Sequence, residues 1–319
     1  MANKLIVEIK SRNEKPDIIY ISLPPLSTVD KVVKWACEQR IPVIIDIIDP
    51  GPDVFLKVFP STIKGWAKIP LWPFYNKLKR ITTNSSGISS ISKQYTDWAK
   101  SFTKEKKPSA FFYPAIQLDD VKEAFNKLSS ILKKQEDKLR IIYAGSLASS
   151  YDIPIILDAA EVMEKRHPGK TEFIIAGVGP QENIIKERNL SNVQYLGWLG
   201  QEEIYKQFYL ADIGLTQHTN GATQSVTYKL FDYLSAGLPI LNSLQSEMAD
   251  IITNNKVGFN NKTGDVNGLV TNIEKFLSNK SLLANYKQNA LHLTEEKGDS
   301  KIVYHQLIEF VESVKASYR

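Results

Sequence analysis

Cysteine is nearly absent from this sequence: among 319 residues, Cys37 is the single one. A lone cysteine excludes an internal disulfide framework and a cysteine-based metal cluster. It is also typical of proteins that work in a reducing compartment. Because Cys37 lies in an apolar, helix-like pattern, we expect its side chain in the core rather than as a reactive thiol.

Long apolar runs are missing as well. No stretch approaches the roughly 18 uninterrupted apolar residues of a transmembrane helix. The first ten residues are too short and too charged for the apolar part of a signal peptide. We therefore expect a cytoplasmic protein, with or without attachment to the inner face of the membrane. No His, Cys, Asp or Glu set has metal-ligand spacing, so we expect no cofactor and no metal.

Positive charge, by contrast, is concentrated in one region. The chain has a net charge of +5, but residues 1–110 hold 18 Lys/Arg and 10 Asp/Glu, a net of +8, which leaves −3 for the remainder. Residues 54–96 hold seven basic residues and no acid, interleaved with aromatic residues. This composition is typical of contact with anionic lipid or nucleic acid. Because three prolines interrupt residues 54–80, we predict a short amphipathic pair that contacts the membrane peripherally; a lid packed on its own domain is the alternative.

Apolar strands alternate with helices along the chain. Strands are predicted at 17–23, 42–48, 87–92, 111–113, 139–144, 172–176, 193–196, 212–215 and 239–241. Helices are predicted at 1–12, 28–39, 93–102, 119–138, 152–166, 181–189, 201–210, 225–236, 246–253 and beyond 266. This alternation indicates an α/β fold with parallel sheets covered on both faces, here as two Rossmann-like domains facing a cleft. We place the two domains at 1–118 and 119–300. A C-terminal helix is expected at 301–319, and the N-terminal domain is one surface on which it would pack.

Loops at the carboxyl ends of the strands are where such sheets bind ligands. In the second domain, Gly145, Ser146, Val178 and Gly179 stand at such ends. Small residues there let a flat ligand approach the backbone. Glycine is equally the ordinary residue of a tight turn, so these positions favour a binding site only weakly.

The loop 219–224, which runs into the predicted helix 225–236, is a stronger signal. Lys229 lies one turn inside, where its ammonium reaches a phosphate, and Asp232 shares its face and has a carboxylate that accepts hydrogen bonds from ribose hydroxyls. An ordinary capped helix with a surface Lys–Asp pair is the alternative. Free N–H groups at the start of this helix would bind a diphosphate, and they belong to Gln224, Ser225, Val226 and Thr227.

One segment, YKLFDYLSAGLPI at 228–240, resembles a signature stretch of the family 4 glycosyltransferases, which are retaining enzymes of the GT-B fold. Four further matches follow the family's order, and the resemblance covers 139 to about 280 well and 16–115 more loosely: IYAGSL (142–147), FIIAGVGP (173–180), VQYLG (193–197) and YLADIGL (209–215). The resemblance implies that Lys229 and the amides of 224–227 hold the diphosphate and that Asp232 holds the ribose. It also implies a nucleobase framed by Val178, Gly179, Gly197 and Trp198.

The sequence departs from that family in three places. Gln224, which carries no charge, stands where the family has the first acid of a pair. The loop 146–152 lacks the Arg and Lys that the family often has there. The chain also reaches Pro16 early, as if its first βα units were missing, so we expect an incomplete N-terminal domain.

Candidates for the reaction itself are few. Asp46 and Asp49 end a strand at the expected cleft, where they would act as a base for the acceptor hydroxyl or would only cap the loop. His218 precedes the donor helix and would contact the sugar or the phosphate.

We therefore predict a retaining hexosyltransferase that moves a sugar from a nucleotide-sugar donor to a polysaccharide or lipid-linked oligosaccharide. No nucleic acid is expected as a partner. The alternative is a protein that binds a nucleotide sugar without turnover, or that needs a partner to complete the N-terminal domain. A sugar-nucleotide epimerase of the same fold would need acids that this sequence lacks.

Overall fold

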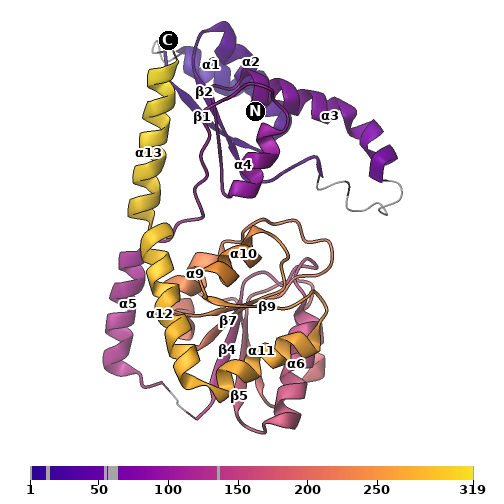
Figure 1. Ribbon diagram of the computed structural model, residues 1–319, viewed down its shortest axis with the longest axis vertical. Coiled ribbons are helices and arrows are strands. Elements are labelled where there is room, and N and C mark those ends of the chain that lie inside the picture. Colours follow the sequence, from indigo (N-terminus) through magenta and orange to yellow (C-terminus); the bar gives the residue numbers. More distant parts are fainter. Residues whose placement is uncertain (1, 12–14, 54–55, 57–63, 135–136, 319) are drawn as a thin grey trace. The chain divides into compact units, whose positions relative to one another are not determined.

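A computed structural model of the protein describes residues 2–11, 15–53, 56, 64–134 and 137–318. The chain forms two compact units. Unit 1 comprises Met1–Tyr113 with Val303–Arg319, and unit 2 comprises Pro114–Ile302. Each unit has its own parallel sheet and its own apolar core. Figure 1 draws the ribbon of unit 1 in indigo to magenta and in yellow, and most of unit 2 in magenta to orange.

Unit 1 is built on a parallel sheet with the strand order β1-β2-β3. Its strands are β1 (Ile19–Leu23), β2 (Val43–Ile47) and β3 (Gly87–Ser90). Its helices are α1 (Ala2–Ser11), α2 (Leu26–Glu38), α3 (Lys64–Asn84), α4 (Lys93–Lys100) and most of α13 (Ser300–Ser317). The α13 helix packs closely on this sheet, because a Cβ added to Gly87 would lie 3.0 Å from Val314.

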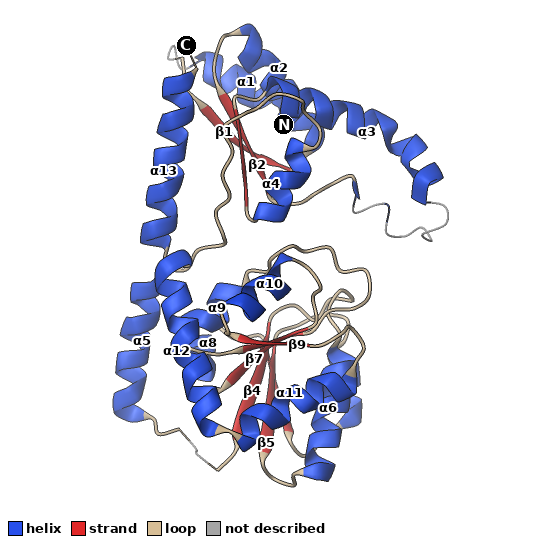
Figure 2. Ribbon diagram, in the orientation of Figure 1, coloured by secondary structure: helices blue, strands red, loops and turns tan. Residues whose placement is uncertain are grey.

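Unit 2 is built on a parallel sheet with the order β6-β5-β4-β7-β8-β9 (Figure 2). Counted within the unit this is 3-2-1-4-5-6, the Rossmann order, in which the chain reverses direction across the sheet between β4 and β7. The strands are β4 (Leu139–Ala144), β5 (Thr171–Ala176), β6 (Val193–Gly197), β7 (Ile213–Thr216), β8 (Ile240–Asn242) and β9 (Gly258–Asn260). The helices are α5 (Leu118–Ile131), α6 (Ile153–Arg166), α7 (Glu182–Arg188), α8 (Gln201–Leu210), α9 (Lys229–Ser235), α10 (Glu247–Asn254), α11 (Val266–Ser278) and α12 (Lys280–Lys297).

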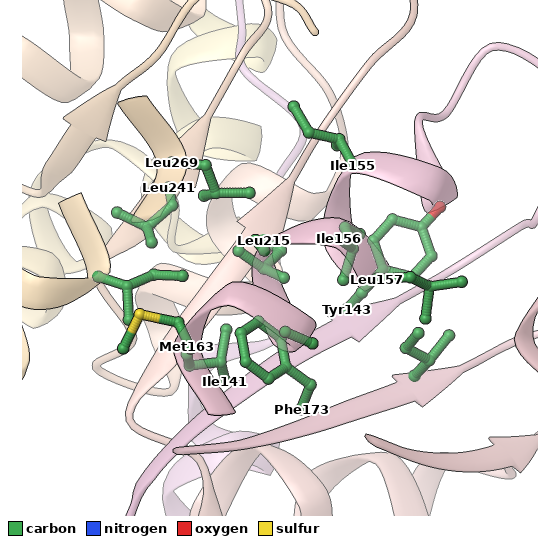
Figure 3. Packing of buried hydrophobic residues seen from close by; sticks show 14 of the residues in the cluster. Ile141, Tyr143, Ile155, Ile156, Leu157, Met163, Phe173, Leu215, Leu241 and Leu269 are labelled. Carbon is green, nitrogen blue, oxygen red and sulfur yellow. The ribbon is translucent and has the colours of Figure 1, made fainter. Parts of the chain in front are cut away.

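The main core of unit 2 lies on one face of this sheet. Alternate residues of β4, namely Ile141 and Tyr143, join Phe173 of β5 in one fully buried cluster, as expected where every second side chain points to the same face. Helices α6 and α11 cover this face, and Figure 3 shows Met163 and Leu269 among their contributions. This packing fixes the strand ends from which the site is built.

Three local predictions for unit 1 are wrong. The segment 111–113 is not a strand. The chain there makes only isolated hydrogen bonds to β3, such as the one from the Phe112 N–H to the Ser90 carbonyl at 2.8 Å. Helix α2 begins two residues before the predicted start, after Pro25, and no side chain caps it. Cys37 lies on the outer face of α2 and is exposed rather than in the core, because its neighbour Ala36 takes the buried position.

The predicted amphipathic pair within 54–80 is only partly tested, because residues 54–55 and 57–63 lie outside the described residues. From Lys64 the chain is one helix, α3, that contains Pro70 and Pro73. The φ of proline is already helical, so each ring removes one N–H and strains the preceding turn without forcing an end. Burial of Leu78 and Ile81 in the core of unit 1 anchors the C-terminal half of the helix.

The predicted helix at 225–236 is shorter than expected. α9 begins at Lys229, because the backbone before it bonds outside the helix. The Ser225 carbonyl accepts from the Ser246 hydroxyl at 2.6 Å and from the Met248 N–H at 3.1 Å, so it is not available as an ordinary helical acceptor. The amides of 224–227 therefore do not form the helix start on which the predicted diphosphate site rested.

Within the described ranges, no helix combines the length and the apolar character needed to cross a bilayer.

Candidate functional site

A cavity of about 700 Å³ opens in unit 2 at the carboxyl ends of β4, β5 and β6. It lies at the edge where parallel sheets of this order bind ligands. Of the predicted site, the structure brings six residues into its wall: Gly145, Ser146, Val178, Trp198, Lys229 and Asp232.

The floor of this cavity is backbone. Gly145 has φ +144° and Gly177 has φ +138°, values that side-chain-bearing residues rarely adopt. A Cβ on Gly177 would lie 1.8 Å from the Gly145 carbonyl oxygen, and one on Gly145 would lie 2.6 Å from Nζ of Lys229. Glycine is therefore required at both positions, and a ligand here meets main chain and an ammonium group.

Lys229 projects this ammonium from the first residue of α9. Its side chain is 8% exposed, and Nζ lies 4.1 Å from the ring centre of Tyr151 and 5.4 Å from that of Tyr143. The rings stabilise the cation through their π faces. Among the described residues no carboxylate forms an ion pair with Lys229, so its charge remains available to an anionic ligand.

Asp232 lies one turn further along α9 and lines the same cavity. Burial raises the pKa of its carboxyl group to about 6, and the charge of Lys229 opposes that rise. The carboxylate forms readily above this value and then offers acceptors to hydroxyl groups. Tyr233, the next residue, fixes this turn to the sheet, since its hydroxyl accepts a hydrogen bond from the Ala144 N–H at 2.8 Å.

His218 follows β7 and is fully buried behind the cavity wall. Its Nδ1 lies 3.3 Å from the Thr216 carbonyl, and a carbonyl only accepts, so Nδ1 carries the proton. Nε2 is then a bare acceptor, and it has no partner among the described residues. Burial, followed by the charge of Lys229, lowers the pKa of His218 to about 4, so the ring is neutral near pH 7. A neutral acceptor suits a hydroxyl and disfavours a phosphate oxygen.

The rim of the cavity is apolar. Trp198, directly after β6, is 74% exposed, and Val178, two residues after β5, is 47% exposed. A planar ligand group placed between them would cover both.

Six predicted donor or catalytic residues lie elsewhere within unit 2. A Cβ on Gly179 would meet Leu147, so this glycine serves packing. The Gly197 carbonyl accepts from the Gly177 N–H. The segment before α9 lies beside α10 rather than in the cavity wall, with its side chains half-buried or buried: Gln224, Ser225, Val226 and Thr227.

Asp46 and Asp49 belong to unit 1. Asp46 lies within β2, half-buried, and its carboxylate accepts from the Ser89 hydroxyl at 2.8 Å. Asp49 is exposed in the turn that follows. The described contacts do not join the two carboxylates to each other.

Sequence reasoning missed part of the wall. Ile116, Gln117 and Asp120, at the start of α5, line the cavity together with Gln201 and Tyr205 of α8. No motif quoted above includes residues 115–120, so no sequence signal pointed to this part of the wall. The aromatic rings under Lys229 were also missed, although Tyr143 lies in the quoted IYAGSL segment.

Comparison with known proteins defines the class. The model of the family described as Glycosyl transferases group 1 matches residues 124–292, more than half of the chain. The chain belongs to this family.

Two curated relatives are similar in sequence. A chitobiosyldiphosphodolichol beta-mannosyltransferase of Candida albicans is 24% identical over 231 residues, which cover 66% of this chain and 49% of that protein. The amylovoran biosynthesis glycosyltransferase AmsK of Erwinia amylovora is 25% identical over 182 residues, 54% of this chain and 44% of that protein. The chain thus spans about half the length of the curated relatives it matches.

Solved structures establish the fold. HepE of Anabaena in complex with UDP superposes with a TM-score of 0.72 at 14% identity, covering 98% of this chain and 82% of that one. Sucrose-phosphate synthase of Thermosynechococcus elongatus gives a TM-score of 0.75 at 13% identity, covering 99% and 77%. The predicted α/β fold of GT-B type is confirmed.

Proposed function

We propose that this protein transfers a sugar from a nucleotide-sugar donor to a polysaccharide or lipid-linked oligosaccharide. The observation that carries the proposal is the cavity at the carboxyl ends of β4, β5 and β6, where Lys229 offers a cation beside Asp232. Membership of the glycosyl transferase family and the acceptors named in its relatives support the choice of substrates.

We propose one orientation of the donor in the cavity. The diphosphate lies on the glycine floor against Lys229, the ribose hydroxyls bond to Asp232, and the base lies against Trp198 and Val178. The predicted contact of His218 with the donor sugar stays a proposal, since its ring is fully buried and does not line the cavity. Each part of the donor meets a group of matching chemistry.

The proposed source of catalysis is stabilisation of the negative charge that develops on the leaving diphosphate. The bond between the anomeric carbon and the diphosphate oxygen breaks with its electron pair left on the diphosphate, and Lys229 stabilises that charge. The acceptor hydroxyl oxygen bonds to the anomeric carbon from the same face, as retention requires, and its proton passes to a carboxylate or to the leaving diphosphate. We assign a hexosyl group to the donor. Because Lys229 supplies the countercharge, we propose that no metal is needed.

Asp46 and Asp49 remain proposed candidates for the base that takes the proton of the acceptor hydroxyl. Replacement of each by Asn, with turnover measured at saturating donor, separates the two.

Turnover is tested with UDP-, GDP- and TDP-sugars together with polysaccharide or lipid-linked acceptors, and release of the nucleoside diphosphate is measured. Lys229→Met should lower kcat by about 100-fold or more, because one stabilising donor to the leaving group is lost. Lys206→Met is the matched control on α8, where the lysine is exposed and paired with Glu203. Donor binding without release would favour the alternative of a nucleotide-sugar-binding protein.

Peripheral membrane contact through α3 is part of the proposal. Ile69 and Trp72 are 63% and 65% exposed and lie three residues apart, on one side of the helix. Lys79 is exposed two turns further on. An apolar edge with a cation beside it suits an anionic bilayer surface and a lipid-linked acceptor. We propose a cytoplasmic location at that surface.

A further inference from the structure

A second cavity, of about 1100 Å³, lies in unit 2 at the opposite edge of the sheet from the donor cavity. It is bounded by the amino end of β4 at Leu139, by the residues just before β5 and β7, and by the helices α11 and α12. None of its lining residues lines the donor cavity.

The lining is strongly basic. The lining includes six lysines and three carboxylates, so its net charge is +3 when His167 is neutral. The lysines come from four separate segments of the chain, so no single helix produces the cluster. They are Lys134, Lys138, Lys170, Lys275, Lys280 and Lys287.

Two of the three carboxylates are already engaged. Glu274 contacts His167 at 3.0 Å and Arg166 at 3.3 Å. Asp212 accepts from Nζ of Lys287 at 2.6 Å and from the Arg140 N–H at 3.0 Å. The carboxylates therefore do not neutralise the remaining lysines, and no ion pair joins Lys138 or Lys280 to a described acid.

Two of these ammonium groups are held close together. Nζ of Lys134 lies 3.4 Å from the Ala211 carbonyl, while Lys287 bonds to the next residue, Asp212. Desolvation and then the charge of Lys287 lower the pKa of Lys134 to about 8, in spite of Asp212. Lys287 already has Asp212 as its counterion, whereas no described carboxylate forms an ion pair with Lys134, so a bound anion would supply the counterion that Lys134 lacks.

The remaining wall is apolar, with Leu139, Phe276 and Leu283 contributing. Lys280 is the first residue of the 18-residue helix α12, so the positive end of its dipole adds to the lysines. A concave shape with an apolar side suits a small molecule better than a flat bilayer or a nucleic-acid strand.

We propose that this lysine cavity binds a small polyphosphate anion, either an inorganic polyphosphate or the phosphate chain of a nucleotide. Lys134 and Lys287 hold one phosphate and Lys280 with the start of α12 holds another. The site is separate from donor binding, and its occupation stabilises unit 2.

Titration calorimetry of the full chain with inorganic triphosphate tests the proposal, with ATP as a second probe. We expect saturable binding that persists in Lys229→Met, in which the donor cavity has lost its cation. The double variant Lys134→Gln/Lys280→Gln should bind at least about tenfold more weakly, because charge-assisted hydrogen bonds are lost. Tighter binding of ATP than of triphosphate would identify a nucleotide as the ligand.

The matched control is Lys127→Gln/Lys165→Gln, which removes two exposed lysines of the same unit that pair with Glu123 and Glu161. Circular dichroism verifies that each variant is folded. The proposal is overturned if wild-type protein binds no triphosphate, if the control loses as much affinity as the test variant, or if Lys229→Met abolishes binding. Binding to anionic lipid vesicles alone, with none to triphosphate, would equally overturn it.

Discussion

Burial and one ammonium group together set the charge of two residues near the donor cavity. Burial, followed by the charge of Lys229, lowers the pKa of His218; burial raises the pKa of Asp232, and Lys229 limits that rise. The histidine thus stays neutral while the carboxylate ionises above about pH 6. A donor diphosphate adds negative charge beside Lys229, so we expect it to raise both values.

Asp232→Asn should stabilise the ligand-free protein while weakening donor binding. The folded pKa of about 6 lies above the ordinary 3.8, so ionising Asp232 costs stability. The stability that the neutral carboxyl group of Asp232 contributes is intact below about pH 4 and is lost as the pH rises through 6. The advantage of the Asn variant should therefore grow between pH 4 and 7, to at most about 3 kcal/mol.

Urea unfolding of both proteins at a series of pH values measures this difference. His218 titrates in the same window, but it is present in both proteins and its contribution largely cancels. A pH-independent difference would contradict the assigned pKa of Asp232.

Gly145→Ala should abolish donor binding, since the new methyl group would require Lys229 to move and would strain φ +144°. Gly200→Ala is the control, because Gly200 has φ −71° and open space around its Cβ position. Thermal shift with the preferred nucleotide sugar compares them: the control should respond as wild type does. A Gly145→Ala protein with wild-type affinity would show that the diphosphate does not lie on this floor.

At the scale of the element, prediction from sequence succeeded where a strand or helix is fixed by its own pattern. β4 and α8 have the predicted bounds. The mostly apolar sequence of β4 and the glycine that precedes α8, Gly200, leave no competing structure. α9 was predicted five residues too long, four of them at its start, since the Ser225 carbonyl bonds to Ser246 and Met248 at the start of α10, a contact that no local pattern reveals. The cluster of Tyr143 and Tyr151 under Lys229 was missed for the same reason.

Helix α3 gives a prediction at this scale. Ile69→Ala/Trp72→Ala should lower binding to anionic vesicles by about tenfold or more, because two exposed apolar side chains are lost from the helix surface. Vesicle sedimentation at two salt concentrations measures it. The control is Tyr304→Ala on α13, where an aromatic ring is 54% exposed. Equal losses in both variants would mean that α3 is not the contact.

For the whole molecule, two separate cores imply two units that unfold in separate transitions. We expect calorimetry to show a transition that shifts upward with nucleotide sugar and another that does not. At a donor concentration of about 100 times Kd, the first should gain about 2.7 kcal/mol, a shift of roughly 5–10 °C for a unit of this size. Lys229→Met should lose the shift; a shift of both transitions together would mean that the units unfold as one.

The contact between Gly145 and Gly177 limits how this protein can diversify. Where two main chains touch, no substitution is tolerated, so the floor of the cavity is closed to change by mutation. New donor preferences must then arise at the rim, where Trp198 and Gln201 have room for other side chains. A library that varies Trp198, Gln201 and Asp120 while keeping both glycines is therefore the rational starting point for altering which sugar nucleotide is accepted.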